Sequence, residues 1–384
     1  MEIKLMPKDF EEYAEARRNG FMKAKKIKED GGKIAGIFCA FTPLEIIEAS
    51  GAMPVSLCGS SEEPIIDAEA HLPKNICPMV KSSYGFAITD KCPYTYFSDI
   101  IIGETTCDAK KKMFELMGKM KNLHVMQLPQ SVERESSWSM WAEEVELLRK
   151  RLENEFDIEI TDQMLREKVK DRNEYRKLHL KFLELGKLVP PPLKGIDMGT
   201  VLDGLNYEFD MEGKCEKLRS LIDNTVESYN QGLRPVSPDA KRILITGCPM
   251  GGVIEKTVGF IDEEGGVVVC FENCGGVKNA GKLIDPDSQD IVKAIADRYL
   301  SIGCSVISPN TNRMNHIEEL IEEYRIDGVV EIILQACHTY NIESEITKSI
   351  SNSLGVPHIR IETDYSSSDE GQLRTRLAAF IEML

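Results

Sequence analysis

The segment Ile34-Ala35-Gly36-Ile37-Phe38-Cys39 decides the fold of this chain. Its apolar run predicts a short buried strand, and Thr42-Pro43 directly afterwards predicts the start of a helix, because threonine caps helices and proline suits the first helical position. An opening helix is expected over 10–28, and its end at Gly31-Gly32 fits a natural helix stop. The same alternation continues with strands at 53–57, 99–103 and 124–128 and a helix at 108–120. Alternating strands and helices predict a parallel, doubly wound sheet.

A second run of the same pattern starts after Pro235–Pro238. Strands are expected at 242–246, 266–271, 328–334 and 358–362, each followed by a helical segment. Between the two runs, charged segments with leucine at helical spacing predict long helices at 138–156, 161–188 and 211–230. The predicted fold is therefore α/β, with two doubly wound parallel-sheet (Rossmann-like) domains facing each other across a cleft. The expected divisions are 1–130 for the N-terminal α/β domain, 131–234 for a helical bridge and 235–384 for the C-terminal α/β domain.

Composition excludes several classes of function. The 384 residues carry a net charge of −16, which argues against nucleic acid and against an anionic membrane surface as partners. No apolar run approaches the length of a membrane helix, and Met1-Glu2-Ile3-Lys4 does not resemble a signal peptide. We therefore expect a cytoplasmic protein, in a reducing compartment where structural disulfides are rare.

Cysteines are abundant for such a compartment, at eleven in the chain. Any one of them, taken alone, is more simply a small buried hydrophobe. Ligands of open α/β sheets gather beyond the carboxyl ends of strands, and five cysteines are expected there: Cys39, Cys107, Cys248, Cys274 and Cys337. Cys77 is expected at a helix start, where free backbone N–H groups can meet a thiolate. Because Cys270 and Cys274 are the closest pair and no Cys-x-x-Cys occurs, dispersed thiols favour an iron–sulfur cluster over structural zinc.

At these residues the chain resembles the D-component family of the 2-hydroxyacyl-CoA dehydratases. The stretches that carry the resemblance are Gly36–Glu45 with Ala49–Ala52, Asn75-Ile76-Cys77-Pro78, Glu104-Thr105-Thr106-Cys107-Asp108, Ile245–Pro249, Gln335-Ala336-Cys337-His338 and Ile361–Tyr365. In dehydratase subunits three cysteines hold one [4Fe–4S] cluster, and the resemblance carries this role to Cys77, Cys107 and Cys337.

The further cysteines Cys39, Cys248 and Cys274 are more similar to a neighbouring branch, the double-cubane cluster proteins. That resemblance implies two [4Fe–4S] cubanes joined by a bridging sulfide and bound by six thiolates. We expect three from each half: Cys39, Cys77 and Cys107, then Cys248, Cys274 and Cys337. Cys92 is the main rival for a ligand position and Cys58 a weaker one, while Cys215, Cys270 and Cys304 are assigned to packing.

The resemblance also implies an activity. Members of both branches receive low-potential electrons from a separate ATP-hydrolysing iron–sulfur activator, and this chain has no Walker A loop of its own. The double-cubane resemblance implies a reductase acting on a small molecule in the cleft, in a homodimer that one complete cluster per chain makes natural. Glu104 and His338 are the candidate proton-transferring residues. Glu272 could shuttle protons or cap a helix, and Glu362, Asp364 and Tyr365 are expected to anchor a loop.

Three alternatives remain open at this stage. One is a 2-hydroxyacyl-CoA dehydratase subunit with a single [4Fe–4S] cluster, a coenzyme A substrate and a non-identical partner subunit. Another is an electron carrier or cluster scaffold without substrate turnover. The last is a thiol-rich α/β protein that binds no metal.

Overall fold

A computed structural model describes residues 7–384. Packing divides the chain into two compact units, each built around one sheet. The first-sheet unit comprises Asn19–Glu174 and Lys282–Asn312. The second-sheet unit comprises the described residues up to Arg18, Tyr175–Gly281 and Arg313–Leu384. Two long helices, α1 (Pro7–Glu29) and α8 (Asp162–Glu184), contribute residues to both units.

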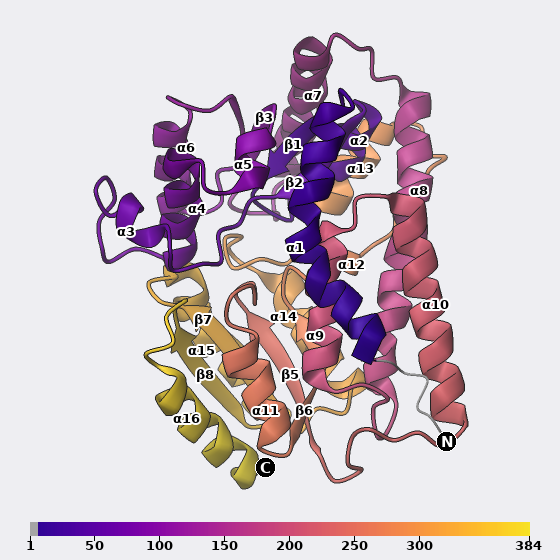
Figure 1. The fold of residues 1–384 in the computed structure, drawn as a ribbon, viewed down its shortest axis with the longest axis vertical. Coiled ribbons are helices and arrows are strands. Elements are labelled where there is room, and N and C mark those ends of the chain that lie inside the picture. The colour runs from indigo at the N-terminus through magenta and orange to yellow at the C-terminus, as the bar shows by residue number, and fades with distance from the viewer. Residues whose placement is uncertain (1–6) are drawn as a thin grey trace. The chain divides into compact units, whose positions relative to one another are not determined.

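The first sheet has four parallel strands in the order β2-β1-β3-β4. Figure 1 labels β1, β2 and β3. Its strands are β1 (Lys33–Ile37), β2 (Ala52–Ser56), β3 (Ile100–Glu104) and β4 (Leu123–Met126). Its helices are α2 (Leu44–Ala49), α3 (Ile65–Ala68), α4 (Pro78–Thr89), α5 (Pro93–Phe97), α6 (Asp108–Met117), α7 (Glu135–Phe156) and α13 (Ile291–Leu300).

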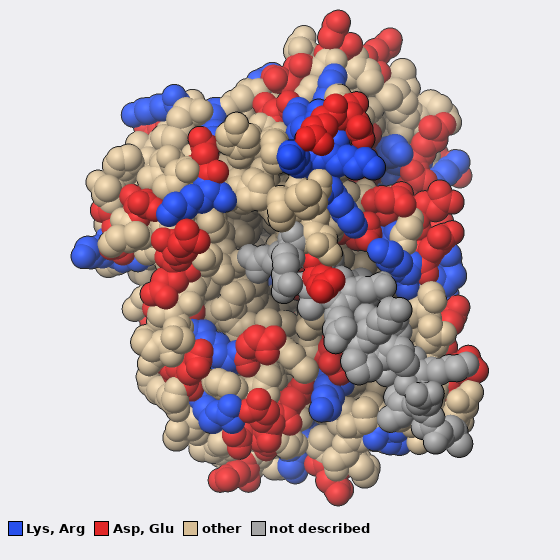
Figure 2. All heavy atoms as spheres, viewed as in Figure 1, with Lys and Arg blue, Asp and Glu red and all other residues tan. Residues whose placement is uncertain are grey.

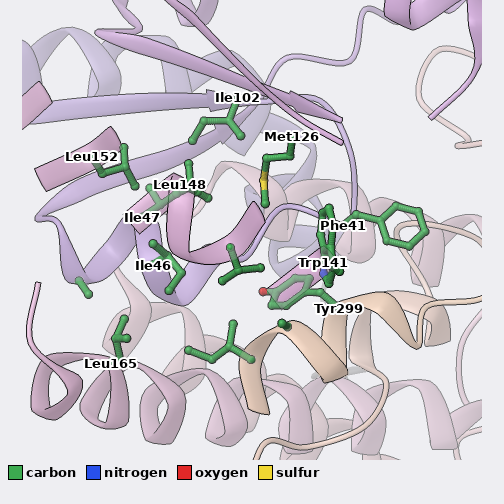
Figure 3. Packing of buried hydrophobic residues seen from close by; sticks show 14 of the residues in the cluster. Phe41, Ile46, Ile47, Ile102, Met126, Trp141, Leu148, Leu152, Leu165 and Tyr299 are labelled. Carbon is green, nitrogen blue, oxygen red and sulfur yellow. The ribbon is translucent and has the colours of Figure 1, made fainter. Parts of the chain in front are cut away.

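The two faces of this sheet follow from the alternation of side chains along a strand. Ala35, Ile100 and Ile102 point to the face that α2 and α7 cover, and they join one apolar cluster with Trp141 and Tyr299 (Figure 3). Trp141 is fully buried there, with its ring edge toward Phe41. Each fully buried aliphatic side chain of this kind stabilises the fold by about 2 kcal/mol.

The opposite face allows α6 to approach closely. A Cβ at Gly103 would lie 2.5 Å from the Phe114 ring, so glycine is required for α6 to pack directly on β3. Helix α4 packs beside α6 on this side. The close approach fixes where the first turn of α6 begins, directly after the carboxyl end of β3.

The second sheet repeats this order as β6-β5-β7-β8, again fully parallel. Its strands are β5 (Lys241–Gly247), β6 (Gly266–Glu272), β7 (Gly328–Leu334) and β8 (His358–Thr363). The helices of this unit are α9 (Gly195–Gly204), α10 (Met211–Asn230), α11 (Phe260–Glu263), α12 (Val277–Ala280), α14 (Thr311–Glu323), α15 (His338–Ser353) and α16 (Glu370–Met383). A π-helical turn η3 (Glu255–Gly259) precedes α11, and two 3₁₀ turns, η1 (Leu185–Lys187) and η2 (Leu205–Tyr207), follow α8 and α9.

The predicted fold class is confirmed: two parallel four-stranded sheets carry flanking helices, and every expected strand is present within two residues of its expected bounds. The three-part division at 130/131 and 234/235 stays a prediction. Packing groups the residues differently, because α13 packs on α7 and therefore joins the first-sheet unit.

Charged side chains of both signs lie on the surface. On the face drawn in Figure 2, Lys and Arg side chains are interspersed with Asp and Glu. None of the helices in the described part of the chain is long and apolar enough to cross a bilayer.

Candidate iron–sulfur ligands at two strand edges

Three cysteines follow the three adjacent strands β2, β1 and β3. Cys39 and Cys58 each lie two residues beyond a strand, and Cys107 lies three residues beyond β3. Because the strands are parallel and neighbouring, their carboxyl ends share one edge of the sheet. We call Cys39, Cys58 and Cys107 the first-sheet thiols.

One buried lysine, Lys110, lies on the first turn of α6 and shares a carbonyl group with one of the first-sheet thiols, Cys58. Its Nζ donates to the carbonyl of Phe38 over 2.8 Å, and the Cys58 Sγ donates to the same carbonyl over 3.0 Å. Burial lowers the pKa of Lys110, but the electrostatic effects of Cys58, Cys39, Cys107 and Glu104 outweigh burial, so the pKa lies well above its ordinary value. The lysine is therefore a permanent cation among three thiols.

Cysteine also begins several helices here. Cys77 is the N-cap of α4, Cys92 of α5 and Cys107 of α6, each with no side-chain cap hydrogen bond. Helices α4 and α6 pack side by side, and the loop after Cys58 bonds to α4 through Gly59 N–H and Ser83 Oγ, 2.8 Å apart. The N-terminal N–H groups of such helices favour negative charge on the capping thiol.

Glu104 ends β3 and is fully buried. The Thr42 hydroxyl donates to one of its oxygens, while Oε2 has no hydrogen-bond partner. Burial raises the pKa of Glu104 to about 7, against the opposing effects of Thr42 and Lys110. A carboxyl group that exchanges its proton near neutral pH is suited to proton transfer.

The second sheet brings a second pair of thiols together. Cys248 follows β5 and Cys337 follows β7, the neighbouring strand, and the two side chains share a hydrogen bond. That bond, with the backbone N–H of Tyr340 and the hydroxyl of Thr339, lowers the pKa of Cys337 below its usual value although burial opposes it. The Leu334 N–H also donates to the Cys248 Sγ over 3.4 Å.

Unusual backbone precedes both of these thiols. Gly247 has φ of 104°, and a Cβ there would lie 2.2 Å from the Ile332 carbonyl oxygen, so only glycine fits. Ala336 has φ of 57°, a left-handed conformation that alanine rarely adopts. Backbone strain of this kind clusters at functional sites.

The remaining predicted residues of the second sheet divide into two groups. Cys274 is half-buried, two residues beyond β6, and Cys337 is the N-cap of α15. His338 lies at the first position of α15, and its charge helps to lower the pKa of Cys337. Glu272, by contrast, caps no helix: it is the last residue of β6, its carboxylate forms ion pairs, and the next helix, α12, has Gly276 as its N-cap.

Glu272 belongs to a fully buried set of charges. Lys278 Nζ lies 3.1 Å from it and Arg313 Nε 3.3 Å. Arg313 also pairs with Glu331 and Glu343, and the Tyr340 hydroxyl accepts from Lys278 over 3.0 Å. Burial would raise the pKa of Glu272, but Lys278 and Arg313 outweigh it, so the pKa falls below its ordinary value. Its ion pairs connect β6 with α12 and α14, the capping role suggested from sequence is wrong, and a role in proton transfer stays a prediction.

Three further cysteines are expected to pack only. Cys215, Cys270 and Cys304 are all buried, and burial raises the pKa of Cys270 well above its ordinary value. A thiol held neutral in this way is a poor ligand.

Sequence reasoning missed Lys110, Lys278 and Arg313, and its ranking of Cys58 as a weaker rival for a ligand position stays a prediction. The position of Cys58 could have indicated a candidate ligand. Strands β2 and β6 occupy the same place in the two sheets, and Cys58 lies two residues after β2 as Cys274 lies two residues after β6. No comparable signal marks the charged residues, since lysine and arginine on helices usually face solvent.

The candidate donors at the two sheet edges are all cysteines. Among residues 7–384 no three Cys, His, Asp or Glu side chains are close enough to hold one metal ion. A cluster spreads its cysteines over different iron atoms, and thiolates are the ligands that it takes.

Fold and thiols together define a two-unit α/β protein with cysteine at the edges of both sheets. A family model described as "2-hydroxyglutaryl-CoA dehydratase, D-component" matches residues 39–384, and the chain belongs to this family.

Relatives along the whole chain agree with the family. YjiM of Escherichia coli (strain K12), provisionally named a dehydratase subunit, is 47% identical over 99% of this chain and 98% of its own. The (R)-phenyllactyl-CoA dehydratase beta chain of Clostridium sporogenes is 24% identical over 98% of each chain. A benzoyl-CoA reductase chain of Thauera aromatica is 22% identical over 93% of this chain and 90% of its own. The relatives thus include components of both dehydratases and a reductase.

Proposed function

We propose that this protein is an iron–sulfur reductase of the D-component family that holds a double-cubane cluster and reduces a small substrate. The observation that carries the proposal is the presence of thiols at the carboxyl edge of both sheets, around Lys110 in one unit and as the Cys248–Cys337 pair in the other. A single-cluster subunit has no need of Cys39, Cys248 and Cys274 in addition to Cys77, Cys107 and Cys337.

The ligands of the proposed cluster come from each unit in turn. Cys248, Cys274 and Cys337 would supply one cubane. Cys39 and Cys107 would supply the other, with Cys77 as third ligand by resemblance to the family or Cys58 by its position in the repeated strand order. Serine at Cys77 and serine at Cys58, in separate variants, distinguish these choices by which one loses iron.

Bound there, the cluster would supply single low-potential electrons, received from a separate ATP-hydrolysing activator. Glu104 is suited to deliver a proton, because its pKa near 7 keeps a protonated fraction at neutral pH. His338 is the second candidate, directly after Cys337. We further propose a cytoplasmic homodimer, since each chain would carry a complete set of thiolates.

The deciding experiment compares iron content in matched variants. Under the proposal, Cys248→Ser or Cys274→Ser lowers iron bound per chain by about half, because each cubane needs three thiolates. Cys270→Ser is the control, a buried thiol of the same sheet that should leave the iron unchanged. Full iron in both ligand variants would rule the double cubane out.

One other function has support of its own. The (R)-phenyllactyl-CoA dehydratase relative favours a dehydratase subunit with one [4Fe–4S] cluster. That alternative predicts about four iron atoms per chain and turnover of a 2-hydroxyacyl-CoA with an activator and ATP. Such turnover would contradict the reductase.

A further inference from the structure

Lys110 differs from an ordinary surface lysine. It lies on the first turn of α6, three residues after the capping Cys107, and only 8% of its surface is exposed. Its stem runs past the Phe38 ring, with Nζ 5.9 Å from the ring centroid. A buried ammonium group is costly unless a negative charge compensates it.

No carboxylate of the described residues forms an ion pair with Lys110 within 4 Å. Its ammonium group donates a hydrogen bond to the neutral carbonyl of Phe38. Glu104 is the nearest acidic influence, yet burial keeps it protonated in part at neutral pH, and its free Oε2 has no partner. Glu104 therefore compensates the positive charge only in part.

The other groups that act on Lys110 are the first-sheet thiols. Cys58 shares the Phe38 carbonyl with Lys110, Cys39 is the next residue after Phe38, and Cys107 caps the same helix. Of these, Cys58 has the strongest effect on the lysine, followed by Cys39 and Cys107. Lys110 and Cys58 therefore meet at one carbonyl group, and Cys39 and Cys107 are close to it along the chain and along α6.

The second sheet offers a direct contrast. Lys278 is also buried and lies four residues after a proposed ligand, Cys274. Its charge is already matched by Glu272 at 3.1 Å, and it donates to the Tyr340 hydroxyl. Of these two buried lysines, Lys278 forms an ion pair with a carboxylate and Lys110 does not.

We propose that Lys110 is a positioning residue that supplies the internal counter-charge for the first-sheet thiolates and so raises the reduction potential of the cluster that they hold. This inference rests on the proposed function. When a low-potential donor gives one electron to the oxidised site, the site gains one unit of negative charge. The fixed cation stabilises that reduced form more than the oxidised one, and net charge is among the properties that set cluster potentials.

The test compares Lys110→Met, Lys110→Gln and Lys110→Arg with the control Lys111→Met in anaerobically purified protein. Lys111 is the next residue, more exposed, and paired with Asp108 at 2.8 Å, so the control removes an equal charge outside the site. Lys110→Gln keeps a donor for the Phe38 carbonyl and decides the matter if the methionine variant does not fold. The measurements are iron per chain and the midpoint potential, followed by electron paramagnetic resonance during a redox titration.

The expected result is a more negative midpoint potential in the Met and Gln variants, recovery with Arg, and no shift in the Lys111 control. Variants that keep wild-type iron and a wild-type potential would overturn the inference. A wild-type chain without iron would instead refute the proposed function.

Discussion

Each sheet has a buried glutamate at the end of a strand with a buried lysine nearby: Glu104 with Lys110 in the first sheet, and Glu272 with Lys278 in the second. The two sites differ in whether the charged groups form ion pairs. Around Glu272, two cations meet several carboxylates, and each charged group has an ion-pair partner. Around Glu104, the carboxyl group keeps one oxygen without a partner and Lys110 forms no ion pair in the described residues.

The difference separates structural from functional charge. Buried charges that only brace a fold are matched within the protein, since an unmatched one costs several kcal/mol. Under the proposed function, the bound cluster would supply the negative charge that Lys110 has no ion-pair partner to provide. Substitutions at Glu104 and Lys110 are therefore the ones that test this comparison.

The largest effect is expected from breaking the matched set. Arg313→Met should lower the free energy of unfolding by about 3–5 kcal/mol, because it leaves three buried carboxylates with too little positive charge. Urea unfolding followed by circular dichroism measures the change. Arg374→Met, which removes exposed pairs with Glu263 and Glu264, is the control and should unfold near the wild-type midpoint. Equal midpoints for the two variants would mean that the buried set is dispensable.

Glu104 should make stability depend on pH. Its pKa is about 7 when folded and near 4.5 when unfolded, so the unfolded chain binds fewer protons between these values. The free energy of unfolding should therefore fall by about 3 kcal/mol as pH rises from 4.5 to 7 and level off above.

Glu104→Gln isolates this dependence, because it removes the ionisation and keeps an acceptor for Thr42. Unfolding of both proteins across pH 5–8 gives the difference. If the two curves remain parallel, Glu104 is ionised throughout and the contrast with Glu272 disappears.

A smaller effect distinguishes the two lysines. Lys278→Met should cost about 2–3 kcal/mol of unfolding free energy, since Glu272 and Tyr340 both lose a partner. Lys110→Met in iron-free protein should cost less, because no carboxylate depends on it. Greater destabilisation from the Lys110 variant would contradict the account of unmatched charge.

The smallest effect should come from Cys270. Its buried thiol in β6 packs only, so Cys270→Ser should lower the free energy of unfolding by about 1–2 kcal/mol. Iron per chain should remain at the wild-type value, measured on the same samples. Iron loss with an intact fold would make Cys270 a ligand and change the assignment.

Sequence reasoning recovers the parts of the fold that depend on local pattern. Apolar runs bounded by caps predict both sheets, since strand burial and helix periodicity are visible residue by residue. The strand-end cysteines follow from the same pattern, because their positions depend only on where each strand ends.

Long-range packing is not recovered. The segment 282–312 joins the first-sheet unit because Tyr299 donates to Glu45 and accepts from the Leu44 N–H, contacts that span more than 250 residues. The amphipathic spacing of α13 predicts which face of the helix is buried, but it does not predict that this face packs on α7. The burial of Lys110 could not be predicted from the sequence for a related reason, because it depends on packing against the loop that carries Phe38.

Iron and acid-labile sulfide per chain, measured on protein purified without oxygen, test the central claim most directly. The account predicts about eight iron atoms, four for each cubane, with slightly more sulfide than iron. About four iron atoms would contradict the double cubane and favour the single-cluster dehydratase subunit or a carrier. An iron-free protein would contradict every cluster assignment and leave a thiol-rich α/β protein.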